Sequence, residues 1–292
     1  PIFRKIKVLS ALRTIKIFSV SIIVFYIFFC SFVKAQFLKI HFIDVGEGDS
    51  ILIEAPSGEC AIVDSGNPIS GYKVATYLKR NKVHALEHLI FTHPHLDHVG
   101  GAFFILQMIA VQNICDNGEN LNSLIESGNI YRWYNELVRE NRKYRALTAE
   151  DKLIMGDVVL DVLWPPKVST FSGFNANSLV LMLKYNNFRC LLTGDLTALS
   201  EKQLLRRCPD IKVDVLKVGH HGAADATSRK FLKKISPEIS VISVNKNNVW
   251  GYPSKATINR LKASGSKIYR TDKEGDIVIT VSKQGEIAVN KK

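Results

Sequence analysis

The sequence predicts an α/β protein in which two β-sheets pack face to face with helices on their outer sides. Three observations support this prediction. Strand-like runs alternate with helix-like runs in two successive blocks. Of the 292 residues, 46% are hydrophobic, which is enough for a substantial core. No internal repeat or linker interrupts residues 37–292, so we expect them to form one domain.

The first 36 residues form a separate segment. They contain six basic residues and no acidic one, and residues 17–33 are an almost unbroken apolar run. This pattern predicts either a secretory signal or an uncleaved membrane anchor, and both place the rest of the chain outside the cytoplasm. Without this segment the 39 basic and 27 acidic residues become 33 and 27, or +6. That charge suits a polyanionic partner such as nucleic acid, but it is also typical of a solvated surface.

The first block begins with a meander of short apolar strands separated by turns, in which Gly46 and Gly48 supply the backbone freedom. An amphipathic helix, a buried strand and a second helix follow. In order, the strands are 37–44, 50–54, 61–64 and 86–91, and the helices are 71–80 and 99–108. Cys60, at the start of the third strand, is expected to be a buried thiol, as is Cys190 later in the chain.

Residues 116–150 are polar and helix-like, with arginines interleaved among Tyr131, Trp133, Tyr134 and Tyr144. Two interpretations remain open. The arginines and aromatic rings could grip a single nucleic-acid strand by phosphate contact and stacking. Alternatively, the segment is an amphipathic helix whose aromatic side chains pack inward.

The second block again places strands before helices. Its strand-like runs are 158–163, 178–184, 188–192, 213–218, 239–244, 267–269 and 276–281, and its helix-like runs are 228–235 and 255–263. Two of the strands end in polar residues. One runs into Thr193-Gly194-Asp195, and another ends in Gly219-His220-His221-Gly222.

The turn after the strand 86–91 holds three of the chain's eight histidines, His93, His95 and His98, together with Asp97. Because alternate side chains of a loop can turn inward, His93 and His95 can face one point while Asp97 and His98 face a neighbouring one. Imidazole nitrogens and carboxylate oxygens suit borderline divalent cations such as zinc. We therefore interpret this turn as half of a two-metal centre.

The pattern His-x-His-x-Asp-His, followed by Gly100-Gly101, resembles the metallo-β-lactamase superfamily. Two further blocks, His41 to Ser50 with Ile62 to Gly66, and Leu216 to Gly222, resemble the metallo-β-lactamase-like domain of the ComEC/Rec2 competence proteins. The resemblance covers about residues 37–292. It implies a four-layer αββα sandwich, with Asp64 beside the metal site.

The resemblance also implies the ligand set. His93, His95 and a bridging Asp195 would hold one cation, and Asp97, His98, His221 and Asp195 would hold the other. His220 would be the neighbour that donates to the substrate, although the roles of His220 and His221 could be reversed. Asp97 would also accept a proton, which makes Asp97 and His220 the expected catalytic residues.

The chain departs from the family pattern in several places. No histidine occurs between Val99 and Gly219, where the superfamily usually supplies a third ligand to the first cation. Asn175, Asn177 or Ser178 occupies that region, so the first site is expected to be weak, completed by water, or better suited to manganese than to zinc. Tyr252 stands where the competence group often has histidine, and Ala223 where it often has serine.

These observations predict an exported metal-dependent hydrolase with two divalent metal ions, zinc or manganese, and no nucleotide cofactor. The expected substrate is a phosphodiester, with single-stranded DNA as the example that the resemblance favours. Two alternatives stay open. One is a phosphorylcholine-type or other ester hydrolase, and the other is a catalytically silent DNA-binding module.

Overall fold

The computed structural model describes residues 37–121, 129–168 and 172–291, all of which belong to the unit that begins at Phe37. The apolar run 17–33 and Cys30 lie outside the described residues. Within these described ranges, no helix has both the length and the apolar character needed to cross a bilayer.

The first of two sheets contains eight strands in the order β15-β14-β1-β2-β3-β4-β5-β6. Its strands are β1 (Leu38–Phe42), β2 (Ile51–Glu54), β3 (Cys60–Val63), β4 (Ala85–Ile90), β5 (Ala110–Asp116), β6 (Tyr144–Ala146), β14 (Ile277–Val281) and β15 (Ile287–Lys291). The strands from β15 to β3 are antiparallel, whereas β3, β4, β5 and β6 are parallel.

The second sheet has seven strands in the order β13-β12-β11-β10-β9-β8-β7. They are β7 (Lys152–Met155), β8 (Val158–Trp164), β9 (Val180–Tyr185), β10 (Phe188–Leu192), β11 (Val215–Lys217), β12 (Ile239–Ile242) and β13 (Lys267–Arg270). As in the first sheet, an antiparallel part, β7 to β10, continues into a parallel part, β10 to β13.

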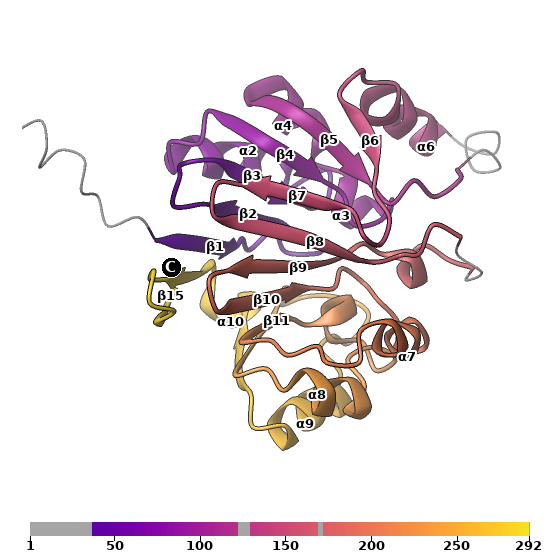
Figure 1. The fold of residues 1–292 in the computed structure, drawn as a ribbon. Helices are drawn as coiled ribbons and strands as arrows, with labels where there is room; N and C mark the ends of the chain where they lie inside the picture. Colours follow the sequence, from indigo (N-terminus) through magenta and orange to yellow (C-terminus); the bar gives the residue numbers. More distant parts are fainter. Residues whose placement is uncertain (1–36, 122–128, 169–171, 292) are drawn as a thin grey trace, which may run out of the picture. The chain divides into compact units, whose positions relative to one another are not determined.

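Three clusters of buried side chains show how the layers are built. One lies between the sheets and joins residues such as Ile40 and Ile53 to Leu160 and Leu181. A second packs α2 (Gly71–Arg80) and α4 (Ala102–Met108) on the outer face of the first sheet. The third packs α7 (Ala198–Arg207), α8 (Arg229–Ile235) and α9 (Lys255–Ala263) on the second sheet. The two groups of helices lie on opposite sides of the paired sheets (Figure 1), which confirms the αββα sandwich.

The single helix expected at 99–108 is instead two helices, α3 (Leu96–Val99) and α4. Gly100 and Gly101 separate them. A Cβ at Gly101 would overlap the carbonyl oxygen of Ser65 and lie 2.9 Å from the Cα of Gly71. Glycine is required at this position because the chain passes too close to its neighbours for a side chain.

The prediction of a helix over residues 116–150 is also wrong in its extent. The described part contains α6 (Asn129–Tyr134) and a short π-helix, η1 (Asn135–Arg139), after which β6 joins the sheet edge. The Asp116 carboxylate holds this segment, because it accepts hydrogen bonds from Tyr134 (2.8 Å), Arg139 (2.7 Å) and Tyr144 (2.7 Å). Tyr134 is 1% exposed, and the neighbouring aromatic rings pack on the same core. These contacts favour the packing interpretation over the nucleic-acid one.

The thiols of Cys60 and Cys190 are buried and free, as expected. The remaining helix of the described ranges is the short α10 (Thr271–Glu274), and η2 (Asn175–Asn177) and η3 (Gly219–Gly222) are 3-10 turns. Both turns lie next to the site described below.

Candidate metal centre

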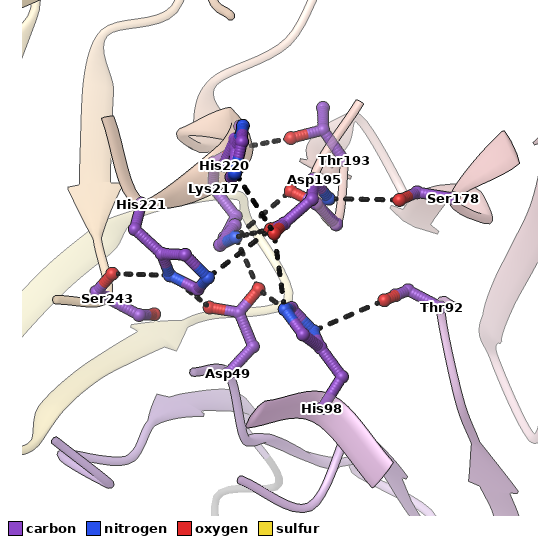
Figure 2. Close-up of polar contacts among 12 residues, drawn as sticks. Asp49, Thr92, His98, Ser178, Thr193, Asp195, Lys217, His220, His221 and Ser243 are labelled. Carbon is purple, nitrogen blue, oxygen red and sulfur yellow. Dashed lines mark hydrogen bonds and ion pairs between the residues drawn. The ribbon is translucent and has the colours of Figure 1, made fainter. Parts of the chain in front are cut away.

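Polar side chains gather where four strands end. Asp64 follows β3, the histidine turn follows β4, Asp195 follows β10, and η3 follows β11. Because β3 is parallel to β4 and β10 is parallel to β11, the carboxyl ends within each pair lie at the same sheet edge. The two sheets thus bring four loops to one site, part of which is drawn in Figure 2.

Two groups of potential metal ligands at this site share Asp195, and a third consists of Asp49, Asp64 and His98. The first group is His93, His95 and Asp195, and the second is Asp97, His98, Asp195 and His221; within each group the ligand atoms lie within 4.8 Å of one another. His98 Nε2 lies 3.4 Å from Asp195 Oδ2, while His221 Nε2 lies 3.5 Å from Asp195 Oδ1 and 3.4 Å from Asp97 Oδ2.

The buried polar atoms in the second group fit a bound cation. His98 Nε2, His221 Nε2 and Asp195 Oδ1 are buried and have no hydrogen-bond partner. Leaving such atoms without a partner costs free energy, and a cation bound between them would remove that cost. Imidazole nitrogens with carboxylate oxygens are a donor set suited to zinc or manganese.

Hydrogen bonds behind the ligands fix the direction in which each ring points. The Asp64 carboxylate lies 2.8 Å from His98 Nδ1 and accepts hydrogen bonds from the Thr92 amide (2.7 Å) and hydroxyl (2.8 Å). His93 Nδ1 lies 3.0 Å from the Thr92 hydroxyl, and His221 Nδ1 lies 3.0 Å from the carbonyl oxygen of Ser243. With their Nδ1 atoms engaged in this way, His98 and His221 leave Nε2 available to the centre. His93 Nε2 lies 3.0 Å from His95 Nδ1, so these two nitrogens face the same point.

The charges of neighbouring carboxylates and imidazoles shift the pKa values of the site residues. Burial alone would lower the pKa of His221, but Asp195, Asp97 and Asp49 outweigh it and raise that pKa to about 10. In the same way, the carboxylates raise the pKa of His98 well above its ordinary value. Burial would raise the pKa of Asp97, yet His98 and His221 hold it below the ordinary range. The site thus attracts positive charge.

Lys217 is the residue of this site that our sequence reasoning missed. Its side chain is fully buried at the end of β11, where the ammonium pairs with Asp49 Oδ2, donates to the carbonyl oxygen of Gly194 (3.1 Å) and lies 3.8 Å from Asp195 Oδ1 (Figure 2). Its partner Asp49 lies in the turn that contains Gly46 and Gly48. A lysine inside the apolar run 213–218 was the available signal, since a buried ammonium needs a carboxylate.

Unusual backbone conformations accompany the ligands. His220 and His221 both have positive φ, 48° and 50°, and Asp64 has φ of 61°. Such conformations are costly for residues with a side chain and occur where the surrounding structure enforces them. Gly48 has φ of 104°, and a Cβ there would overlap the backbone oxygen of Asp97. The turn 46–49 is thus pressed directly against α3.

His220 lies at the edge of the centre and belongs to neither ligand group. Its Nε2 lies 3.9 Å from Asp195 Oδ2 and 3.2 Å from Asn175 Nδ2, and its ring packs on Tyr252 at 5.5 Å between centroids. The residues proposed to replace the third histidine have other partners: Ser178 Oγ accepts from the Asp195 amide (3.2 Å), and Asn177 Nδ2 donates to Glu119 (3.0 Å).

Comparison with known proteins agrees with this architecture. The family model of the metallo-beta-lactamase superfamily matches residues 43–244, more than half of the chain, and the chain therefore belongs to this superfamily. This confirms the family resemblance that the histidine turn indicated.

Similar proteins include Competence protein ComA of Neisseria gonorrhoeae, which is 27% identical over an alignment that covers 83% of this chain and 32% of that protein. ComE operon protein 3 of Bacillus subtilis is 29% identical over an alignment that covers 82% of this chain and 32% of that protein. Recombination protein 2 of Haemophilus influenzae is 28% identical over an alignment that covers 80% of this chain and 28% of that protein. The chain thus spans about a third of the length of these relatives.

Among solved structures, CmlA, a diiron beta-hydroxylase from Streptomyces venezuelae, is similar with a TM-score of 0.54 and 13% identity. The match covers 86% of this chain and 55% of that one. At this level of identity the similarity shows a common fold and nothing further.

Proposed function

We propose that this protein is a metal-dependent hydrolase of phosphodiester bonds, with single-stranded DNA as its substrate. The observation that carries the proposal is the pair of ligand groups that share Asp195. Superfamily membership supports hydrolysis. The relatives named for competence and recombination support DNA, because both names refer to processes that involve it.

Each residue of the site has a role in this proposal. When bound, two divalent cations would neutralise developing negative charge and lower the pKa of a water molecule. His93, His95 and Asp195 would hold one cation, and Asp97, His98, Asp195 and His221 the other. The lowered pKa of Asp97 keeps its carboxylate ionised, as a metal ligand must be. In this proposal the same carboxylate also accepts the proton of the attacking water, whose own pKa bound metal would lower.

His220 would assist the leaving group. Its side chain is 20% exposed, at the edge of the centre. His220 Nδ1 lies 3.5 Å from Asp225 Oδ1, which would hold a protonated imidazole while Nε2 gives its proton to the leaving oxygen. The neutral Nε2 that results would then accept a hydrogen bond from the Asn175 amide, 3.2 Å away.

The test is cleavage of a single-stranded oligonucleotide by the purified chain with zinc, manganese or magnesium. We expect Asp97→Asn to reduce the rate by about 10²–10⁴-fold, the range for loss of a proton acceptor. The exposed Asp157 offers a matched control, Asp157→Asn, which should leave the rate unchanged. No cleavage with any of these metals would refute the proposal, and turnover of phosphorylcholine esters or lactones instead would identify another ester hydrolase.

The third interpretation, a silent DNA-binding module, predicts a different result. DNA binding would then be sensitive to salt, would survive His93→Ala and His98→Ala, and would occur with no metal detected by elemental analysis. The same preparations can be used for both experiments.

We also propose that residues 37–292 act outside the cytoplasm, secreted or anchored through residues 17–33. The basic residues before that apolar run support this orientation. Protease added to intact cells should then digest the domain, whereas protection until the cells are lysed would contradict the proposal.

A further inference from the structure

A pocket of about 690 Å³ adjoins the candidate metal centre. His95, a member of the first ligand group, lines it together with Ser172, Phe174, Asn175, Thr197 and Leu199. Asn175 also contacts His220. The pocket therefore borders the centre through both His95 and Asn175, where a group bonded to the reacting atom would lie.

His95 is the one ionisable residue among the described lining residues of this pocket, and burial lowers its pKa, which favours the neutral imidazole. Among its described lining residues there is no lysine, arginine or carboxylate. Further phosphates of a polyanion would find no counter-charge here. A choline group would find neither a carboxylate nor the several aromatic rings of a cage.

The pocket does offer a rigid ring surface. The Phe174 ring stands edge to face against His95 at 5.3 Å between centroids and lies 5.8 Å from Tyr131. Phe174 also packs on the core under α2 and α4 and is half-buried, so part of its ring remains available. Hydroxyl and amide groups of Ser172, Thr197 and Asn175 lie around it.

We propose that this pocket binds the base of a nucleotide whose phosphate lies at the metal centre, with the base stacked on Phe174. The pocket volume lies in the range of small-molecule sites, an uncharged planar ring fits its walls, and the amide and hydroxyls suit the edges of a base. The proposal rests on the proposed function, because it takes the phosphate to be at the cations.

Binding without turnover tests the base pocket. Thymidine 5′-monophosphate and inorganic phosphate are titrated calorimetrically into the metal-loaded protein. We expect the nucleotide to bind more tightly than phosphate. Phe174→Leu should weaken nucleotide binding about tenfold, because base stacking accounts for roughly 5- to 150-fold in affinity. The same variant should leave phosphate binding unchanged. Phe174→Tyr should retain nucleotide affinity, because it keeps the ring.

Phe103→Leu is the matched control, since Phe103 is a half-exposed ring on α4 that does not line the pocket. Leu199→Ala, at a 60% exposed wall residue, should weaken the nucleotide severalfold and is a second variant in case Phe174→Leu fails to fold. The proposal of a base pocket would be overturned if nucleotide and phosphate bound with equal affinity. It would also be overturned if Phe174→Leu weakened the binding of both by the same factor. Failure to cleave oligonucleotides while the nucleotide still binds through Phe174 would refute only the proposed function.

Discussion

At the scale of single residues, Asp195 has the most connections in the site. Its carboxylate lies within 4 Å of His93, His98, Lys217, His220 and His221. Burial would raise its pKa, but His221 and His98 outweigh burial and hold the pKa well below the ordinary value. The carboxylate therefore stays ionised, as a ligand shared by two cations must.

Loss of this carboxylate should affect both metal positions. In Asp195→Asn we expect the bound metal to fall from two ions per chain towards none, because each ligand group loses a member. In His93→Gln we expect one ion to remain, since His93 belongs only to the first group. Elemental analysis after gel filtration measures both, and retention of two ions by Asp195→Asn would contradict a shared ligand.

We expect Lys217 to contribute most to the free energy of unfolding when no metal is bound. In Lys217→Met the buried carboxylates of Asp49 and Asp195 lose their ammonium, and leaving such a charge unpaired costs about 3–5 kcal/mol. We expect a decrease of this size in the free energy of unfolding in EDTA, and a smaller decrease with saturating zinc, because a cation supplies the missing charge. Urea denaturation in both conditions is the measurement. An equal decrease in both would mean that Lys217 contributes only packing.

At the scale of elements, the position of α3 and of Asp97 should depend on the turn 46–49. Gly48→Ala would place a methyl group against the Asp97 backbone, so we expect it to displace Asp97 and to reduce both metal content and activity. Gly58→Ala is the matched control, because Gly58 has φ of 99° and open space around it. Both variants should lose about 1–2 kcal/mol of folding stability, because alanine is strained at a positive φ that glycine adopts freely. Similar metal content in the two variants would show that the turn does not position Asp97.

A buried histidine on β4 should make stability depend on pH. Burial lowers the pKa of His88, so the unfolded chain binds its proton more readily than the native chain does. The His88 contribution is complete above the unfolded pKa of about 6.5 and is lost as pH falls towards the lower native pKa. In His88→Gln, unfolding free energies between pH 8 and 5 should therefore decrease less than in the parent. A parallel decrease would show that His88 does not titrate differently in the two states.

Much of the fold could be predicted because the information was local. Short apolar runs bounded by turns identified most strands of both sheets. The histidine turn, Thr193-Gly194-Asp195 and Gly219-His220-His221-Gly222 identified the loops that the structure brings together at the candidate site. The predictions failed where contacts with residues distant in the sequence determine the local structure. Residues 144–146 form a strand because they pair with β5 and bind Asp116, and Lys217 is paired by Asp49, far away in the chain.

At the scale of the whole molecule, the centre lies where the two sheets meet. His93, His95, Asp97 and His98 come from the loop after β4 of the first sheet, and Asp195 and His221 come from loops of the second. A cation bound by residues from both sheets connects them. Metal should therefore stabilise the folded molecule as a unit.

This linkage can be measured by thermal unfolding. With free zinc at about 100 times its Kd, the stabilisation is about 2.7 kcal/mol per site, which corresponds to about 5–10 °C in Tm for a domain of this size. EDTA should reverse the increase. In Asp195→Asn, zinc should no longer shift Tm, and an undiminished shift in that variant would place the stabilising metal elsewhere.

The distribution of ligands along the chain also determines when metal can enter during biosynthesis. The histidine turn is made well before Asp195 and His221, so a nascent chain holds only part of either ligand group. Unlike a zinc finger, whose metal organises an otherwise unfolded peptide, this protein would have to assemble both of its sheets before either candidate metal site is complete. Loading would then be a late step of maturation, carried out on a folded molecule in which Lys217 already pairs with Asp49 while His98 and His221 hold Asp195.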